Sequence, residues 1–152
     1  MQLRKSQLVE LVIQGTAAGN TQTQFQFTPQ TYLQGKRMWQ LQVYSVNDVT
    51  ASPLSGNALL PSANMANAFL TLYFADPDSH ANQNGTVPAG QFIQYRSLWT
   101  FHNFVNGTDP YSFAVVDLAG QVVTWEKSFV TFTTAVGNTD NYSIVFDVVY
   151  SE

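Results

Sequence analysis

The sequence predicts an all-β fold: an antiparallel β-sandwich built as a single jelly roll of about eight strands. Apolar and polar side chains alternate with a period of two through most of the chain, and no segment has a convincing helical period. Clusters of Gly, Asn, Ser and Pro separate these segments. The connections between these segments are long in the first half of the chain and short in the second half. This pattern favours a jelly roll over a seven-stranded immunoglobulin-like sandwich or a barrel of regular hairpins.

The alternation is clearest in two early segments. Residues 21–28 place Thr and Phe on one face and Gln on the other, which predicts a half-buried strand that Pro29 ends. Residues 38–46 repeat the pattern and place Trp39 in phase with Leu41. Both segments therefore predict strands that turn one face to a core and an uncharged, amide-rich face away from it.

Two further segments predict strands of different character. Val9, Leu11 and Ile13 alternate with polar residues, which favours a strand, with an amphipathic helix as the alternative. Residues 68–75 are apolar on both faces, so we expect a central strand that is covered on each side.

The second half of the chain predicts the remaining strands. Residues 92–105 are too long for one average strand, and we expect a break near Arg96. Residues 111–116 and 121–125 flank a short Gly-containing connection at 117–120, which predicts a hairpin. The last two predicted strands are residues 129–134 and 142–150, joined by a turn at 137–140.

The connections at 50–66 and 76–90 are long and rich in Asn, Ser, Gly and Pro. Loops of this length are uncommon in compact domains unless they have a function. A short helix near residues 63–68 is compatible with the sequence. The length of 152 residues and the absence of an internal repeat predict one domain over 1–152.

The composition is poor in charge. Charged residues make up 11% of the chain, whereas about 25% is usual, so the surface is weakly protected against association. A net charge of −4 with six Lys and Arg argues against nucleic acid as a partner. The absence of Cys excludes disulfides and thiolate sites, and no segment predicts a secretory signal or a membrane-spanning helix.

No catalytic constellation is predicted, and we expect no enzyme activity. The two histidines, His80 and His102, have no recognisable nucleophile or orienting group beside them. A carboxylate pair for glycoside hydrolysis is conceivable among Asp117, Glu126 and Asp147, but ten acids in a sandwich often give an accidental pair.

One loop deserves consideration as a metal site. Asp76, Asp78, His80, Asn82 and Asn84 alternate in a way that superficially resembles a calcium-binding loop. The closing acidic residue and the flanking helices of an EF-hand are missing, and we interpret the segment as a hydrophilic turn. We therefore predict no metal and no cofactor.

The tryptophans could form a platform for stacking sugars. Trp39 and Trp99 alternate in phase with apolar neighbours, and we interpret these two and Trp125 more simply as core residues. Contacts between protein subunits are the other use of such aromatic side chains, since Trp and Tyr are enriched at interfaces.

A cysteine-free, charge-poor sandwich of this length, with alternating strands at 21–28, 38–46, 68–75 and 142–150 and long loops between early strands, resembles the single jelly-roll capsid proteins of icosahedral viruses. It is most similar to the vertex, or penton, proteins of tailless, membrane-containing bacteriophages. The resemblance is one of architecture and composition, so it carries no functional residue over to this chain.

The resemblance implies a homopentamer at a capsid vertex of the virion, assembled in the host cytoplasm. The partners would be the neighbouring major capsid protein and a spike or receptor-binding protein. Arg4 and Lys5 could reach a neighbouring subunit or an anionic lipid surface, so membrane contact would be at most peripheral. The alternative functions are a carbohydrate-binding or receptor-binding module and, less favoured, a small hydrolase that uses Asp or Glu.

Overall fold

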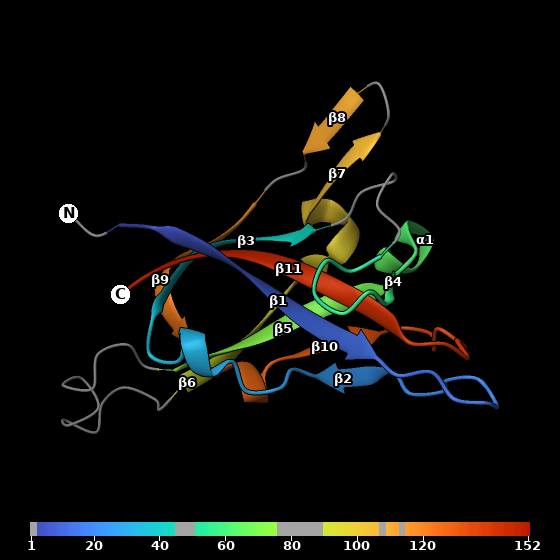
Figure 1. Ribbon diagram of the computed structural model, residues 1–152. Helices are drawn as coiled ribbons and strands as arrows, with labels where there is room; N and C mark the ends of the chain where they lie inside the picture. Colours follow the sequence, from blue (N-terminus) through green and yellow to red (C-terminus); the bar gives the residue numbers. More distant parts are fainter. Residues whose placement is uncertain (1–2, 45–50, 76–89, 107–108, 113–114) are drawn as a thin grey trace.

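The computed structural model describes residues 3–44, 51–75, 90–106, 109–112 and 115–152 (Figure 1). These residues form eleven strands, all joined in one hydrogen-bonded network. Eight of the strands form two four-stranded sheets, in the orders β1-β11-β3-β9 and β2-β10-β5-β6. The buried apolar side chains of both sheets belong to one core cluster. The predicted all-β sandwich is thereby confirmed.

The first sheet consists of β1 (Lys5–Ile13), β11 (Tyr142–Ser151), β3 (Arg37–Tyr44) and β9 (Val116–Val123). The second sheet consists of β2 (Gln24–Gln26), β10 (Phe129–Phe132), β5 (Ala68–Ala75) and β6 (Gly90–Ser97). Four antiparallel pairs are nested along the chain: β1 with β11, β2 with β10, β3 with β9, and β5 with β6. The chain is thus one long hairpin rolled into two layers, which is the topology of a jelly roll.

The remaining elements are short additions to these sheets. β4 (Ala58–Leu59) pairs in parallel with β11, and β7 (His102–Asn106) and β8 (Asp109–Ser112) form a hairpin that projects from the body (Figure 1). The helical turns are η1 (Thr31–Leu33), α1 (Ser62–Met65), η2 (Leu98–Phe101) and η3 (Trp125–Lys127). The long connection predicted at 50–66 therefore contains structure over its described part, including a short helix.

The two sheets meet differently at their two edges. At one edge β9 and β5 pair over two residues, which joins the sheets directly. At the other edge β1 and β2 are the ends of the strand path and lie close together without pairing. The sandwich is therefore nearly a barrel, with a single seam between β1 and β2.

Alternation along the strands positions the core. Val9, Leu11 and Ile13 are almost completely buried, so the predicted strand is confirmed and the helical alternative is wrong. In β5, Leu70 and Leu72 are fully buried on the inner face. The alternate residues of β5 point to the outer face of the second sheet, where Thr71 is 6% exposed and Phe69 and Tyr73 are half-buried.

A bulge in β3 changes the direction of Trp39. Met38 is opposite Tyr150 and Gln40 is opposite Val149, so Trp39 is an extra residue without a partner on β11. A bulge of this kind reverses the alternation on one side of it. Met38 consequently takes the fully buried position, and the predicted core location of Trp39 is wrong.

The hairpin predicted around residues 117–120 is also wrong. Val116–Val123 is one strand, and both of its halves pair with β3. The turn-forming residues make a bulge instead: Ala119 and Gly120 have φ angles of 55° and 73°, and the Ala119 N–H donates to Asp117 Oδ1 at 2.9 Å. The predicted break near Arg96 is confirmed, because β6 ends at Ser97 and η2 separates it from β7.

Candidate interaction surfaces

The outer face of the second sheet carries an aromatic surface that has no acid among its described side chains. Its strand register places Gln26, Phe129, Thr71 and Gln94 in one row across β2, β10, β5 and β6. We define the aromatic face by its outward side chains, which are Phe69, Tyr73, Phe92 and Phe129, framed by Gln24, Gln26, Gln94 and Thr131.

The aromatic side chains of this face contact one another. The ring centroids of Phe92 and Tyr73 lie 4.8 Å apart with planes at 67°, and those of Phe92 and Phe129 lie 6.1 Å apart. Phe92 is 56% exposed although it is a large apolar side chain. Lys127 Nζ lies 4.7 Å from the Tyr73 ring centroid at the border of the face. The packing joins the rings of Tyr73, Phe92 and Phe129 into one group, in which Phe92 is exposed and the other two are half-buried.

Acids are absent from this face among the described outward side chains of β2, β10, β5 and β6. An exposed aromatic patch that lacks acids and is rimmed by amides has the composition of a protein–protein contact, in which aromatic residues are enriched and Asp, Glu and Lys are depleted. The face can form a contact with little cost for removing charges from water.

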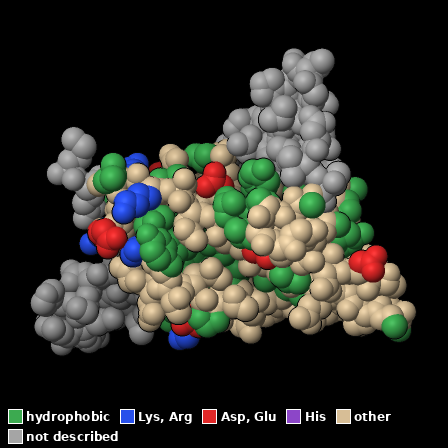
Figure 2. All heavy atoms as spheres, viewed as in Figure 1, with side chains coloured by type: hydrophobic (Ala, Val, Ile, Leu, Met, Phe, Trp, Pro, Cys, Tyr) green, Lys and Arg blue, Asp and Glu red, His purple; other side chains and the backbone are tan. Residues whose placement is uncertain are grey.

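Most of the positive charge of the chain gathers at one end of the sandwich. Figure 2 shows Lys and Arg side chains toward the left end of the visible surface. We define the basic end by four of the six cations, Arg4, Lys5, Lys36 and Arg37, together with the rings of Tyr32, Trp39 and Tyr150. Strand pairing explains the clustering, because Lys5 is opposite Tyr150 and Arg37 is opposite Ser151.

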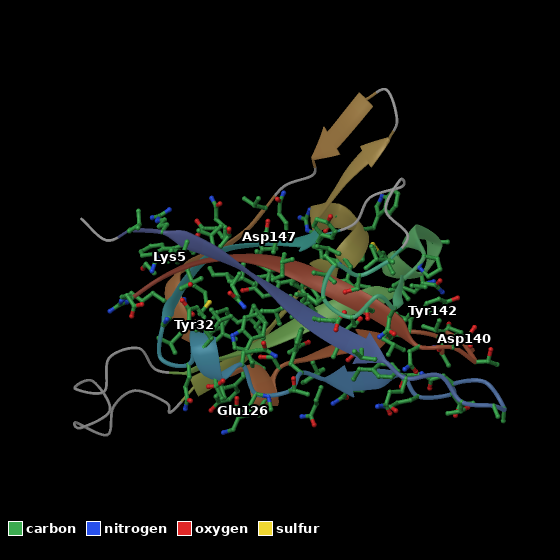
Figure 3. All side chains as sticks on the ribbon, viewed as in Figure 1. Lys5, Tyr32, Glu126, Asp140, Tyr142 and Asp147 are labelled. Atoms are coloured by element: carbon green, nitrogen blue, oxygen red, sulfur yellow. The ribbon has the colours of Figure 1, made fainter. Side chains whose placement is uncertain are left out.

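Lys36 is at the centre of one half of the basic end. Its Nζ lies 3.9 Å from the Tyr32 ring centroid, 5.3 Å from that of Tyr150, and 3.3 Å from Glu152 Oε1. A hydrogen bond to Tyr150, followed by the charges of Lys36 and Lys5, lowers the pKa of Tyr32. The same hydrogen bond, followed by burial, raises the pKa of Tyr150 to about 12. Figure 3 shows Lys5 and Tyr32 at the same end.

The other half is built around Trp39. The Arg4 guanidinium carbon lies 4.2 Å from the Trp39 ring centroid, and Trp39 Nε1 donates to Ser151 Oγ at 2.8 Å. Arg37 Nη1 donates to the Gly120 carbonyl at 3.1 Å. The bulges in β3 and β9 thus hold an indole ring and two guanidinium groups together on the surface. Sequence alternation missed this arrangement because it places Trp39 in the core.

The carboxylates considered for hydrolysis lie on separate elements. Asp117 is on β9, Asp147 is on β11 with β3 between them, and Glu126 is on η3. Figure 3 shows Glu126 and Asp147 on opposite sides of the molecule. Burial raises the pKa of Asp147, and burial followed by the charge of Asp117 raises the pKa of Tyr95 to about 12. These carboxylates do not form a facing acid/base pair.

The other residues considered have mixed outcomes. Trp125 is 1% exposed, which confirms its core position, whereas Trp99 is 38% exposed because η2 interrupts the strand alternation. The loop from Asp76 to Asn84, with His80, lies outside the described residues, as does the side chain of His102. The calcium and histidine interpretations therefore stay predictions. Within the described residues, His, Asp and Glu form no group of three that could hold a metal.

One buried polar cluster was not predicted. The Glu10 carboxylate accepts hydrogen bonds from Ser52 Oγ and, at 2.7 Å, from Ser55 Oγ, and Ser52 is 3% exposed. These contacts fasten the 51–57 segment over the first sheet. The two Ser side chains donate to the same carboxylate, so this arrangement stabilises the loop.

The described residues line at least two cavities that open on the surface. A cavity of about 320 Å³ lies between η1 and the end of β9, and Gln30, Gln34, Thr124 and Glu126 are among its lining residues. A cavity of about 370 Å³ lies in the seam between β1 and β2. Both offer amides and hydroxyls.

Searches with the sequence and the fold find no match among family models, curated proteins or solved structures. Across the described part of the chain, no helix is long and apolar enough to span a membrane. The function is consequently inferred from the jelly-roll topology, the aromatic face and the basic end.

Proposed function

We propose that the chain is a non-enzymatic structural subunit of an icosahedral virus particle, a vertex (penton) protein that assembles into a pentamer. In this role it contacts the neighbouring major capsid protein and supports a spike or receptor-binding protein. The aromatic face is the single observation that carries the proposal, because it offers an acid-free lateral surface to a second copy. The jelly-roll topology is compatible with this role and with several others.

The ring geometry follows from the kind of contact. A closed ring needs a heterologous interface, in which one patch meets a different patch on the next copy. In the proposed ring the aromatic face supplies one of these patches, and the low charge of the chain reduces the repulsion between copies.

A substitution in the aromatic face tests the proposal. Phe92→Gln removes an exposed ring, and we expect it to weaken self-association at least tenfold, since buried aromatic anchors dominate the energy of contacts between subunits. Leu54→Gln is the matched control, because Leu54 is 55% exposed and lies outside the aromatic face. Light scattering after size exclusion measures the mass of each. A wild-type chain that stays monomeric at high concentration would contradict the proposal.

A carbohydrate-binding module is the second candidate. The cavity beside η1 favours it, because Gln30, Gln34, Thr124 and Glu126 supply the amide, hydroxyl and carboxylate groups that bind sugar hydroxyls. Trp125 also lines this cavity, so a change in tryptophan fluorescence on adding sugars would support the module. No binding to any sugar on a broad glycan array would rule out the carbohydrate-binding function.

A further inference from the structure

We propose that the basic end is a docking surface for an anionic lipid bilayer. The proposal goes beyond assembly, and it rests on the proposed function only for the strength that several copies acting together would give. Four of the six cations of an acidic chain lie at this end. Among the described side chains, the one ion pair there joins Lys36 to Glu152, so three cations keep no acidic partner.

Apolar groups beside these cations distinguish a bilayer from other anionic partners. Leu3 is 73% exposed next to Arg4 and Lys5, and Tyr32 is 54% exposed beside Lys36. Tyr and Trp favour the headgroup region of a bilayer, where one part of the ring is apolar and another is wet. Nucleic acid would neutralise the cations but would offer no apolar phase for Leu3.

The arrangement of the cations suits a flat surface. The basic end is formed where β1 begins, where β3 begins and where β11 ends. Arg4 and Arg37 lie beside Trp39 and Gly120, while Lys36 lies over Tyr32. Both groups come from the same end of β1, β11 and β3, because β1 and β3 both run antiparallel to the β11 strand between them. A Lys or Arg side chain that lies over an aromatic ring keeps its positive charge, while its methylene groups cover apolar surface.

The expected strength of one copy is modest. Each Lys or Arg near an anionic leaflet strengthens binding about fivefold. Because Lys36 is paired with Glu152, the other three cations contribute about a hundredfold. A single copy would therefore bind weakly and lose binding as salt is added. Copies joined in a ring would bind much more tightly, because each further contact is made at a high effective concentration.

Vesicle sedimentation tests the proposal. The probes are phosphatidylcholine vesicles with and without phosphatidylserine. We expect the wild-type chain to sediment only with the anionic vesicles, and Arg4→Glu combined with Lys5→Glu to lower the partition coefficient at least 25-fold, about fivefold for each lost cation. Arg96→Glu, measured below the assembly concentration, is the matched control, because Arg96 is an exposed cation on β6 outside the basic end, and it should change the partition far less.

Leu3→Gln provides a second variant that changes no charge. It should lower the partition several-fold, because the exposed Leu3 would enter the apolar boundary of the bilayer. An unchanged partition for both the double variant and Leu3→Gln would overturn the proposal. Binding to duplex DNA at least as tight as binding to the vesicles would also overturn it, in favour of a phosphate-binding surface.

The two proposals fail separately. Light scattering on the same samples reports the assembly state. An assembled chain that ignores anionic vesicles would refute the docking surface and leave the structural function standing. A monomeric chain that still binds anionic vesicles through Arg4 and Lys5 would refute the assembly and leave the docking surface standing.

Discussion

Trp39 illustrates how one extra residue in a strand changes a surface. Strict alternation from Leu41 assigns Trp39 to the core, but the bulge opposite Tyr150 turns its ring outward. The ring then lies between the Arg4 guanidinium and the backbone of Gly120. A bulge depends on pairing between distant segments, so a pattern read along one strand cannot locate it.

Gly120 is required at this position for two reasons. Its φ angle is 73°, and a Cβ atom built on it would lie 2.7 Å from Trp39 Cη2. We expect Gly120→Ala to lower the free energy of unfolding by about 2–4 kcal/mol, combining the cost of left-handed backbone with that of overpacking. Urea unfolding measures the change.

Gly35→Ala is the control for that substitution. Gly35 has a nearly equal φ angle of 74°, but nothing lies within 4 Å of the added Cβ position. It should therefore show only the backbone cost, about 1–2 kcal/mol. Equal losses for the two substitutions would mean that the Trp39 contact contributes nothing.

At the scale of elements, the sequence predicts which segments form strands better than it predicts which strands pair with one another. The alternation of Val9, Leu11 and Ile13 identified β1, and the apolar run at 68–75 identified β5, because burial on one or both faces imposes those patterns. The turn chemistry at 117–120 was also recognised. It makes a bulge rather than a hairpin because β3 pairs on both sides of it, and that neighbour is distant in sequence.

The interaction surfaces were less predictable than the strands. Arg4 and Lys5 were recognised as a basic pair, but Lys36 and Arg37 join them only because β3 and β1 both pair with β11. Likewise, Phe69 and Phe92 come from strands that neighbour each other only after folding. The composition predicts a surface poor in charge. It cannot say which face of the fold carries that surface, because this depends on the order of strands in the sheet.

Ser128 joins η3 to β5 and allows a prediction at this scale. It is fully buried; its Oγ accepts from the Tyr73 N–H at 3.0 Å and donates to the Thr124 carbonyl at 2.9 Å. Ser128→Ala would take the Ser128 Oγ partner from the Tyr73 N–H and leave the Thr124 carbonyl with the Lys127 N–H as its donor. We expect a loss of about 1–3 kcal/mol in unfolding free energy. Chemical denaturation of this variant beside Ser6→Ala, an exposed strand serine, measures it. Equal midpoints would disprove the role of Ser128.

At the scale of the whole molecule, the two proposed surfaces have different orientations. The aromatic face extends along one side of the second sheet, whereas the basic end lies where strands of the first sheet begin and finish. Copies joined through the aromatic face could therefore stand side by side and present their basic ends together. In this geometry, assembly through the aromatic face would strengthen membrane binding through the basic end, although each copy carries both surfaces by itself.

The cooperation gives a measurable consequence. Phe92 lies outside the basic end, so Phe92→Gln should leave the vesicle affinity of one copy unchanged while preventing several copies from binding together. We expect the variant to bind anionic vesicles at least tenfold more weakly than the assembled wild-type chain, and Leu54→Gln to bind like the wild type. Dilution below the assembly concentration should remove the difference between Phe92→Gln and the wild type. If the difference persists in monomers, Phe92 itself contacts the bilayer, and the face and the end are not separate surfaces.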